Sequence, residues 1–190
     1  LDKYNVFLFD FRGFGESEGG YTTAGYKEVK DLDAALNYLR GRNNSGSIGA
    51  FGFSLGASVA IMSKNENVKA IVADSPYSSL NNMIEAMYKN FYFLKYPFVY
   101  MTKLYGRLFF GIDTKEVSPD SAIKSMNKPI LLIHGDQDEI VPLSQSEEII
   151  QHINEPKKLA VINDMGHNVS NIDQMNIICK EIGYWLEKYL

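Results

Sequence analysis

The sequence predicts an α/β fold in which helices flank a mostly parallel sheet. Short apolar segments alternate along the chain with longer segments whose apolar residues recur at helical spacing. This alternation is typical of a parallel sheet with helices on both faces. The length of 190 residues, with 45% hydrophobic and 22% charged residues, is ordinary for one globular domain with a sizeable core.

The strands are predicted from short apolar segments bounded by glycine, proline or polar residues. In chain order they cover residues 4–9, 47–51, 68–73, 129–134 and 158–162. Right-handed helical connections bring the carboxyl ends of parallel strands to one edge of the sheet. We therefore expect the residues that directly follow these strands to lie close together.

The helices are predicted from apolar stripes and from signals at their N-termini. Residues 26–40 and 172–189 each carry one apolar face, and residues 55–64 form a short helix after the second strand. The spacing of Ser144 and Glu147 is typical of a capping box that opens a helix through residue 152. The two apolar faces consist of Val29, Leu32, Leu36 and Leu39 in the first helix, and of Ile172, Met175, Cys179, Ile182 and Leu186 in the last.

A serine stands between two glycines where the second predicted strand ends and a helix begins. Gly52, Ser54 and Gly56 form a Gly-x-Ser-x-Gly sequence, in the strand–turn–helix context that a nucleophile elbow requires. The glycines are expected to leave room in a sharp turn that presents the Ser54 hydroxyl. The N–H of Leu55, at the start of the helix, is the predicted oxyanion donor.

An acidic residue and a histidine follow the last two predicted strands. Asp138 comes after the fourth strand, and His167 comes after the fifth. In a serine hydrolase a histidine takes the serine proton, and a carboxylate holds the imidazole in one tautomer. Asp138 is the favoured acid, and Asp136 and Asp74 remain alternatives because both also lie near strand ends.

The sequences around Ser54, Asp138 and His167, together with residues 10–17, resemble those of an α/β-hydrolase-fold serine hydrolase. The resemblance extends over nearly the whole chain. The order serine, acid, histidine is that of the family. The sequence Asp-x-Arg-Gly-x-Gly-x-Ser is similar to the segment after the family's fourth strand, and His-Gly-x-x-Asp-x-x-Val-Pro to the one after its seventh. The resemblance implies that Ser54, Asp138 and His167 form a catalytic triad.

The resemblance also implies an N-terminally truncated domain. Residues 4–9 would be the family's fourth strand, so strands one to three would precede Leu1, with the loop that donates the second oxyanion N–H. In the family, strand three separates strands four and five. The chain would therefore pair these two strands directly, borrow a strand from another copy or require the preceding segment. We expect an unusual strand order or an oligomer that covers the open edges, and a poor enzyme from the isolated chain.

One long segment interrupts the alternation of strands and helices. No strand is predicted between Asp74 and Pro129, and residues 91–111 hold nine of the chain's 24 aromatic residues. By position, the segment is similar to the helical cap that many α/β-hydrolases insert at this point. The predicted division is a cap at residues 77–121 inserted into a core of residues 1–76 and 122–190.

The predicted cap consists of short helices broken near Pro97, with Lys95, Lys103 and Arg107 in solvent. Three interpretations remain open: a lining for an acyl or aromatic pocket, which we favour, a satellite core, and a contact with a membrane interface. The predicted pocket residues are Phe53, Phe91, Phe93, Phe98, Tyr100 and Phe109.

The predicted function is hydrolysis of a carboxylic ester, thioester or small amide through an acyl-enzyme. The expected partner is a small-molecule acyl substrate. The alternative is a non-catalytic or inactive α/β-hydrolase fragment that serves as a binding module. The expected location is the cytoplasm, or a membrane to which a preceding segment anchors the protein.

Composition narrows the other classes of partner and cofactor. The net charge of −4, without a basic stripe, argues against nucleic acid as the main partner. A single cysteine excludes an internal disulfide, and three histidines without clustered acids or thiols predict no metal site. No cofactor is expected. His134 is predicted to be structural, and His152 to lie on a solvated helix face.

Overall fold

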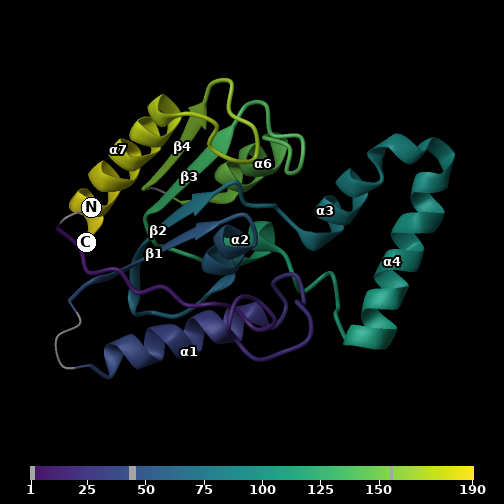
Figure 1. Cartoon of the computed structure of the whole chain (residues 1–190), viewed down its shortest axis with the longest axis horizontal. Coiled ribbons are helices and arrows are strands. Elements are labelled where there is room, and N and C mark those ends of the chain that lie inside the picture. The colour runs from purple at the N-terminus through teal and green to yellow at the C-terminus, as the bar shows by residue number, and fades with distance from the viewer. Residues whose placement is uncertain (1–2, 43–45, 155) are drawn as a thin grey trace.

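The sheet contains four parallel strands among the described residues, which are 3–42, 46–154 and 156–190 of this computed structural model. They lie side by side in chain order, and Figure 1 shows them between layers of helices. The predicted α/β class is therefore confirmed. The strands are β1 (Ile48–Phe53), β2 (Val68–Asp74), β3 (Ile130–Gly135) and β4 (Lys157–Ile162).

Helix α7 covers one face of the sheet, and α1, α2 and α6 pack on the other (Figure 1). The four helices that were predicted with bounds, α1, α2, α6 and α7, begin and end within two residues of them. The helices are α1 (Glu28–Arg40), α2 (Leu55–Met62), α3 (Leu80–Met87), the 3₁₀ helix η1 (Lys89–Leu94), α4 (Lys95–Phe110), α5 (Pro119–Ile123), α6 (Ser144–His152) and α7 (Ile172–Tyr189).

The two central strands are buried on both faces. Val72 and Leu131 pack in the core under α7, whereas Ile71 and Leu132 pack in the core on the opposite face. Helices on both sides of a parallel sheet demand apolar residues at successive positions. This burial explains why these strands have nearly continuous apolar sequences.

Helix α7 has the predicted bounds but buries a different stripe. Of the predicted stripe only Ile182 is buried, and Cys179 is exposed. Apolar residues at adjacent positions, such as Ile177 and Ile178, are compatible with two stripes about 100° apart. Contact with the sheet selects the one that buries the large Trp185 side chain. The buried residues are Gln174, Ile178, Ile182 and Trp185.

Helix α1 buries Leu32 and Leu36 of the predicted stripe, together with an unexpected carboxylate, Glu28. Glu28 accepts hydrogen bonds from the Thr23 N–H at 2.7 Å and the Gly25 N–H at 2.9 Å. Burial acts to raise the pKa of Glu28, but hydrogen bonds from the Thr23 hydroxyl and N–H and from the Thr22 hydroxyl outweigh it and hold the pKa below its usual value. Glu28 thereby fastens the preceding glycine-rich loop to α1.

The capping box predicted at the start of α6 is wrong, although the helix has the predicted bounds. The N-cap residue is Leu143, and no side chain accepts a capping hydrogen bond. Ser144 instead lies inside the first turn. The N–H groups of Gln145 and Glu147 donate to the carbonyl oxygens of Pro142 and Leu143.

Residues 4–9, predicted as a strand, do not form one. A cavity of about 190 Å³ lies along the open edge of β1, and Phe7 and Phe9 line it from the other side. A strand needs a partner backbone about 4.8 Å away. Because this cavity and its apolar side chains lie between the two segments, no ladder joins them. Direct pairing of residues 4–9 with β1, one of the three expected outcomes, is therefore wrong.

Helices α3, η1 and α4 form a helical arm that projects from the side of the sheet (Figure 1). As predicted, the described part of the chain has no strand between β2 and β3. The break predicted near Pro97 lies instead at Tyr92, whose φ is 48°. Pro97 lies in the first turn of α4, where its missing N–H removes no helical hydrogen bond.

Two of the three basic residues predicted to face solvent are half-buried. Lys95 and Lys103 lie 3.4 and 4.0 Å from the carboxylate of Glu85, on the preceding helix of the arm. Arg107 is exposed as predicted.

Candidate active site

Ser54 occupies a strained turn between β1 and α2. Its φ of 52° and ψ of −111° are backbone angles that residues other than glycine rarely adopt. The Ser54 N–H donates to the Asp74 carbonyl oxygen at 2.8 Å, which ties the turn to the end of β2. A Cβ on Gly52 would lie 2.3 Å from the Gly56 backbone, so Gly52 is required by close approach. The expected clash at Gly56 is absent, because a Cβ there would meet ordinary contacts only.

The loops after β1, β3 and β4 bring three predicted side chains together. His167 Nε2 lies 3.1 Å from Ser54 Oγ, and His167 Nδ1 lies 2.7 Å from Asp138 Oδ2. A carboxylate only accepts, so Nδ1 carries the proton and Nε2 of the neutral ring is free to accept from the Ser54 hydroxyl. This is the tautomer that a general base beside a serine needs.

Asp138 is fixed in place by the turn that follows β3. Its Oδ1 accepts from the N–H groups of Ile140 at 2.9 Å and Val141 at 2.8 Å, and its side chain is fully buried. Gly135 makes this turn feasible, because a Cβ there would lie 2.1 Å from the Met165 carbonyl oxygen in the loop that carries His167. The alternative acid Asp136 is exposed.

His134 is buried behind Asp138, consistent with its predicted structural role. Burial lowers the pKa of His134, so the ring is neutral at pH 7. Its Nε2–H donates to the Val141 carbonyl oxygen at 2.8 Å and lies 3.4 Å from Asp138 Oδ2. Its Nδ1 then accepts from the Ser146 hydroxyl at 2.7 Å. His152, predicted to be solvated, is partly exposed and pairs with Asp120.

Asp74, the other alternative acid, ends β2 beside this group but does not occupy the acid position. Its Oδ1 accepts from the Ser75 hydroxyl at 3.2 Å, while His167 Nδ1 is taken by Asp138. Burial raises the pKa of Asp74 to about 6, although the Ser75 hydrogen bond and the nearby His167 oppose this rise. Asp74 is therefore a buried carboxyl that titrates below neutral pH.

Replacing Asp74 by asparagine is expected to change how stability depends on pH. The folded protein favours the protonated carboxyl, so the wild type loses stability as pH rises from about 4 to about 6. Asp74→Asn removes this loss. Relative to the wild type, its free energy of unfolding should rise between pH 4 and pH 7 by up to about 3 kcal/mol, measured by urea denaturation.

The exposed Asp136→Asn variant is the matched control and should show no such difference. If the free energy of unfolding of Asp74→Asn differed from that of the wild type by the same amount at pH 4 and at pH 7, a raised pKa for Asp74 would be contradicted.

Two further predicted residues lie beside the serine. Leu55 is the first residue of α2, so its N–H has no acceptor within the helix and is free to bind an anion. The ring centroid of Phe53 lies 4.9 Å from that of His167, and Phe53 is exposed. Phe53 thus forms an apolar wall next to the imidazole.

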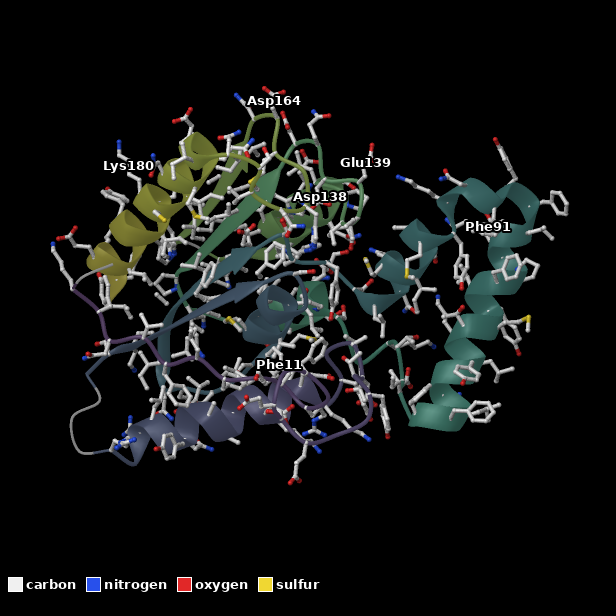
Figure 2. All side chains as sticks on the ribbon, viewed as in Figure 1. Phe11, Phe91, Asp138, Glu139, Asp164 and Lys180 are labelled. Atoms are coloured by element: carbon white, nitrogen blue, oxygen red, sulfur yellow. The ribbon has the colours of Figure 1, made fainter. Side chains whose placement is uncertain are left out.

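Two of the five predicted pocket residues of the arm, Phe91 and Phe98, contact each other, with ring centroids 5.3 Å apart. Phe91 and Phe98 both pack against Tyr88, with centroids 5.6 Å away. Figure 2 shows Phe91 on the arm, well apart from Asp138. Phe93, Tyr100 and Phe109 are exposed. The part of these five residues in binding an acyl group stays a prediction.

Two residues that shape the surroundings of this site were not predicted from the sequence. The strained Ser75, with φ of 53°, and the buried Gln145 organise the loop after β2, where Gln145 Oε1 accepts from the Ser78 N–H at 3.0 Å. Neither residue belongs to a recognisable motif. Among the described residues, no group of three His, Cys, Asp or Glu side chains is placed to hold a metal ion.

Solved structures share this architecture. An esterase from Pyrococcus furiosus, Pf2001, is 32% identical, with a TM-score of 0.77 over 98% of this chain and 71% of the esterase chain. The esterase domain of a Rhodothermus marinus protein is 19% identical, with a TM-score of 0.66 over 87% of this chain and 70% of that chain. These neighbours establish an α/β-hydrolase-like fold.

Curated relatives are longer than this chain. YqkD of Bacillus subtilis is 27% identical over 190 residues, which cover 97% of this chain and 62% of YqkD. YfhR of Escherichia coli K12 is 30% identical over 172 residues, which cover 87% of this chain and 54% of YfhR. The chain thus spans between about half and two thirds of the length of these relatives. The prolyl oligopeptidase family matches residues 3–190, and the chain belongs to this family of α/β hydrolases.

Proposed function

We propose that the protein is a serine hydrolase that cleaves a carboxylic ester, thioester or small amide through an acyl-enzyme. The observation that carries the proposal is the hydrogen-bonded chain from Ser54 Oγ through His167 to the buried Asp138. The strained conformation of Ser54 supports it, because strain of this kind concentrates at functional sites. The likeness to an esterase at 32% identity is consistent with an acyl substrate.

In the first half-reaction, Ser54 Oγ attacks the substrate carbonyl carbon as His167 Nε2 takes the hydroxyl proton. The buried Asp138 stabilises the imidazolium that forms. The Leu55 N–H donates to the oxyanion of the tetrahedral intermediate. The imidazolium then protonates the leaving alcohol, thiol or amine, and the acyl group remains on Ser54. Water, deprotonated by His167, releases the acid in the second half-reaction.

Labelling with a fluorophosphonate probe tests the proposal without knowledge of the substrate. The probe reacts with a serine hydroxyl activated by a base, so the native chain should carry one adduct, at Ser54, found by mass spectrometry of its peptides. His167→Ala should slow labelling by about 10²- to 10⁴-fold, because the general base is lost. His152→Ala is the matched control, since His152 pairs with Asp120 on the exposed side of α6.

Rapid labelling that persists in His167→Ala, or that falls on a different serine, would contradict the proposed base and nucleophile. A folded native chain that the probe does not label at all would favour the alternative, an α/β-hydrolase module that binds without reacting.

A further inference from the structure

The helical arm exposes an unusual amount of aromatic and aliphatic surface. Helix α4 has 16 residues, and Val99 is the one that is buried. At the tip of the arm, Tyr92 and Phe93 are 86% and 81% exposed, and Tyr96 is 75% exposed. Soluble proteins rarely expose contiguous apolar surface of this extent unless it binds something.

Four of the exposed apolar residues of α4 form one stripe along the helix. Pro97, Met101, Leu104 and Leu108 are spaced by four, three and four residues, so they share one face of the helix, and all are exposed. The stripe runs along a helix of about 24 Å, at 1.5 Å per residue. A helix with this pattern normally buries the stripe, and here no described element covers it.

The same segment is strongly basic. Between Glu85 and Asp113 the sequence has no acidic residue, whereas it has three lysines and one arginine. The contrast is marked because the whole chain carries a net charge of −4. Lys89 and Arg107 are exposed and form no ion pair within the described part of the chain, so their charges are available to a partner.

We propose that the arm docks on the surface of an anionic phospholipid bilayer. Tyrosine and phenylalanine prefer the headgroup level of a membrane, where one end of the side chain is apolar and the other is wet. A helix with an apolar stripe and flanking lysine or arginine residues lies in the plane of that interface. Among the described residues, no helix is long and apolar enough to cross the bilayer.

Charge favours this partner over a second copy of the chain. Pairing two arms through their stripes would bring two basic segments together, with Glu85 as the one acidic residue within α3, η1 and α4, itself already beside Lys95 and Lys103. Like charges across an interface are destabilising. An anionic lipid surface instead contributes about 1 kcal/mol for each basic residue close to it.

Co-sedimentation of the intact chain with vesicles tests the inference. One set of vesicles is phosphatidylcholine alone, and the other contains phosphatidylcholine with about 30% phosphatidylglycerol, each at low and high salt. The chain should bind the anionic vesicles more tightly, and binding should weaken as salt rises. Because docking does not involve the reaction, Ser54→Ala should bind as tightly as the wild type, which separates this inference from the proposed function.

Two double variants, each with a control, separate the contribution of basic charge to vesicle binding from that of apolar contact. Lys89→Gln with Arg107→Gln should weaken binding to anionic vesicles by about 10- to 30-fold, equivalent to about 1 kcal/mol for each charge. The control exchanges two exposed lysines outside the arm, Lys64→Gln and Lys180→Gln, and should change binding little.

Tyr92→Ser with Phe93→Ser should weaken binding by about 10-fold or more, since both side chains are exposed and their loss leaves the core intact. The matched control, Ile177→Ser with Tyr184→Ser, removes two exposed apolar residues from α7.

Absence of binding to anionic vesicles would overturn the inference. So would a dimer, seen by analytical ultracentrifugation, that the Tyr92→Ser and Phe93→Ser exchange dissociates, because the stripe would then be covered by a second copy. Equal binding to both kinds of vesicle at every salt concentration would also contradict it.

Discussion

Ser54→Ala is expected to lower kcat/KM for a small chromogenic ester by about 10⁴- to 10⁶-fold. The variant keeps the turn and the His167–Asp138 hydrogen bond but removes the hydroxyl 3.1 Å from His167 Nε2. Without that oxygen no acyl-enzyme can form, and only the weak effect of oxyanion stabilisation remains. Alanine and serine suffer similar strain at positive φ, so the free energy of unfolding should change by less than about 1 kcal/mol.

The measurement combines initial rates with urea denaturation of the same preparations. Ser47→Ala is the matched control, since this exposed serine precedes β1 at the opposite end of the strand from Ser54. Its activity should equal that of the wild type. A Ser54→Ala variant that retains more than about one tenth of the activity would show that Ser54 is not the nucleophile.

Asp138→Asn is expected to lower kcat by about 10⁴-fold without preventing folding. The N–H groups of Ile140 and Val141 both point at Oδ1, so the asparagine must place its carbonyl oxygen there. Its NH₂ group then takes the position of Oδ2, which faces His167 Nδ1 and also lies 3.4 Å from His134 Nε2.

A donor at this position reverses the tautomer of the His167 imidazole. His167 Nδ1 must accept from the amide, so the proton moves to Nε2 and points at Ser54 Oγ. An imidazole in that form cannot take the hydroxyl proton. The loss should appear in kcat more than in KM, because Asp138 is buried behind His167 and does not reach the substrate.

The neighbouring exposed carboxylate provides the control for this variant. Asp136→Asn makes the same chemical exchange two residues away, and its side chain is outside the hydrogen-bonded chain. It should retain wild-type kcat. If Asp136→Asn lost activity and Asp138→Asn did not, the acid would have been assigned to the wrong residue.

The residues of the candidate site could be predicted because each follows a strand. Ser54, Asp138 and His167 come directly after β1, near the end of β3 and after β4, and parallel strands carry such positions to one edge. Local periodicity and strand ends are properties of neighbouring residues, so they are visible in the sequence. The same reasoning kept Asp74 and Asp136 as alternatives, because both also lie near a strand end.

Three of the errors fall where contacts between distant segments decide the outcome. Residues 4–9 have the composition of a strand, yet pairing depends on a partner backbone, and β1 does not supply one to them. In α7 the sequence was compatible with two stripes, and packing of Trp185 against the sheet selected one. The carboxylate of Glu28 is buried because a loop folds back to donate N–H groups to it.

The sequence by itself determined the order and type of most elements, the glycine that permits the turn at Ser54 and the side chains of the candidate site. Only the tertiary structure decided which carboxylate holds His167 and that burial raises the pKa of Asp74 to about 6. It also decided that α4 leaves its apolar stripe exposed. The physical reason is that backbone propensity and side-chain chemistry are local, whereas burial, desolvation and strand pairing depend on which distant segments meet.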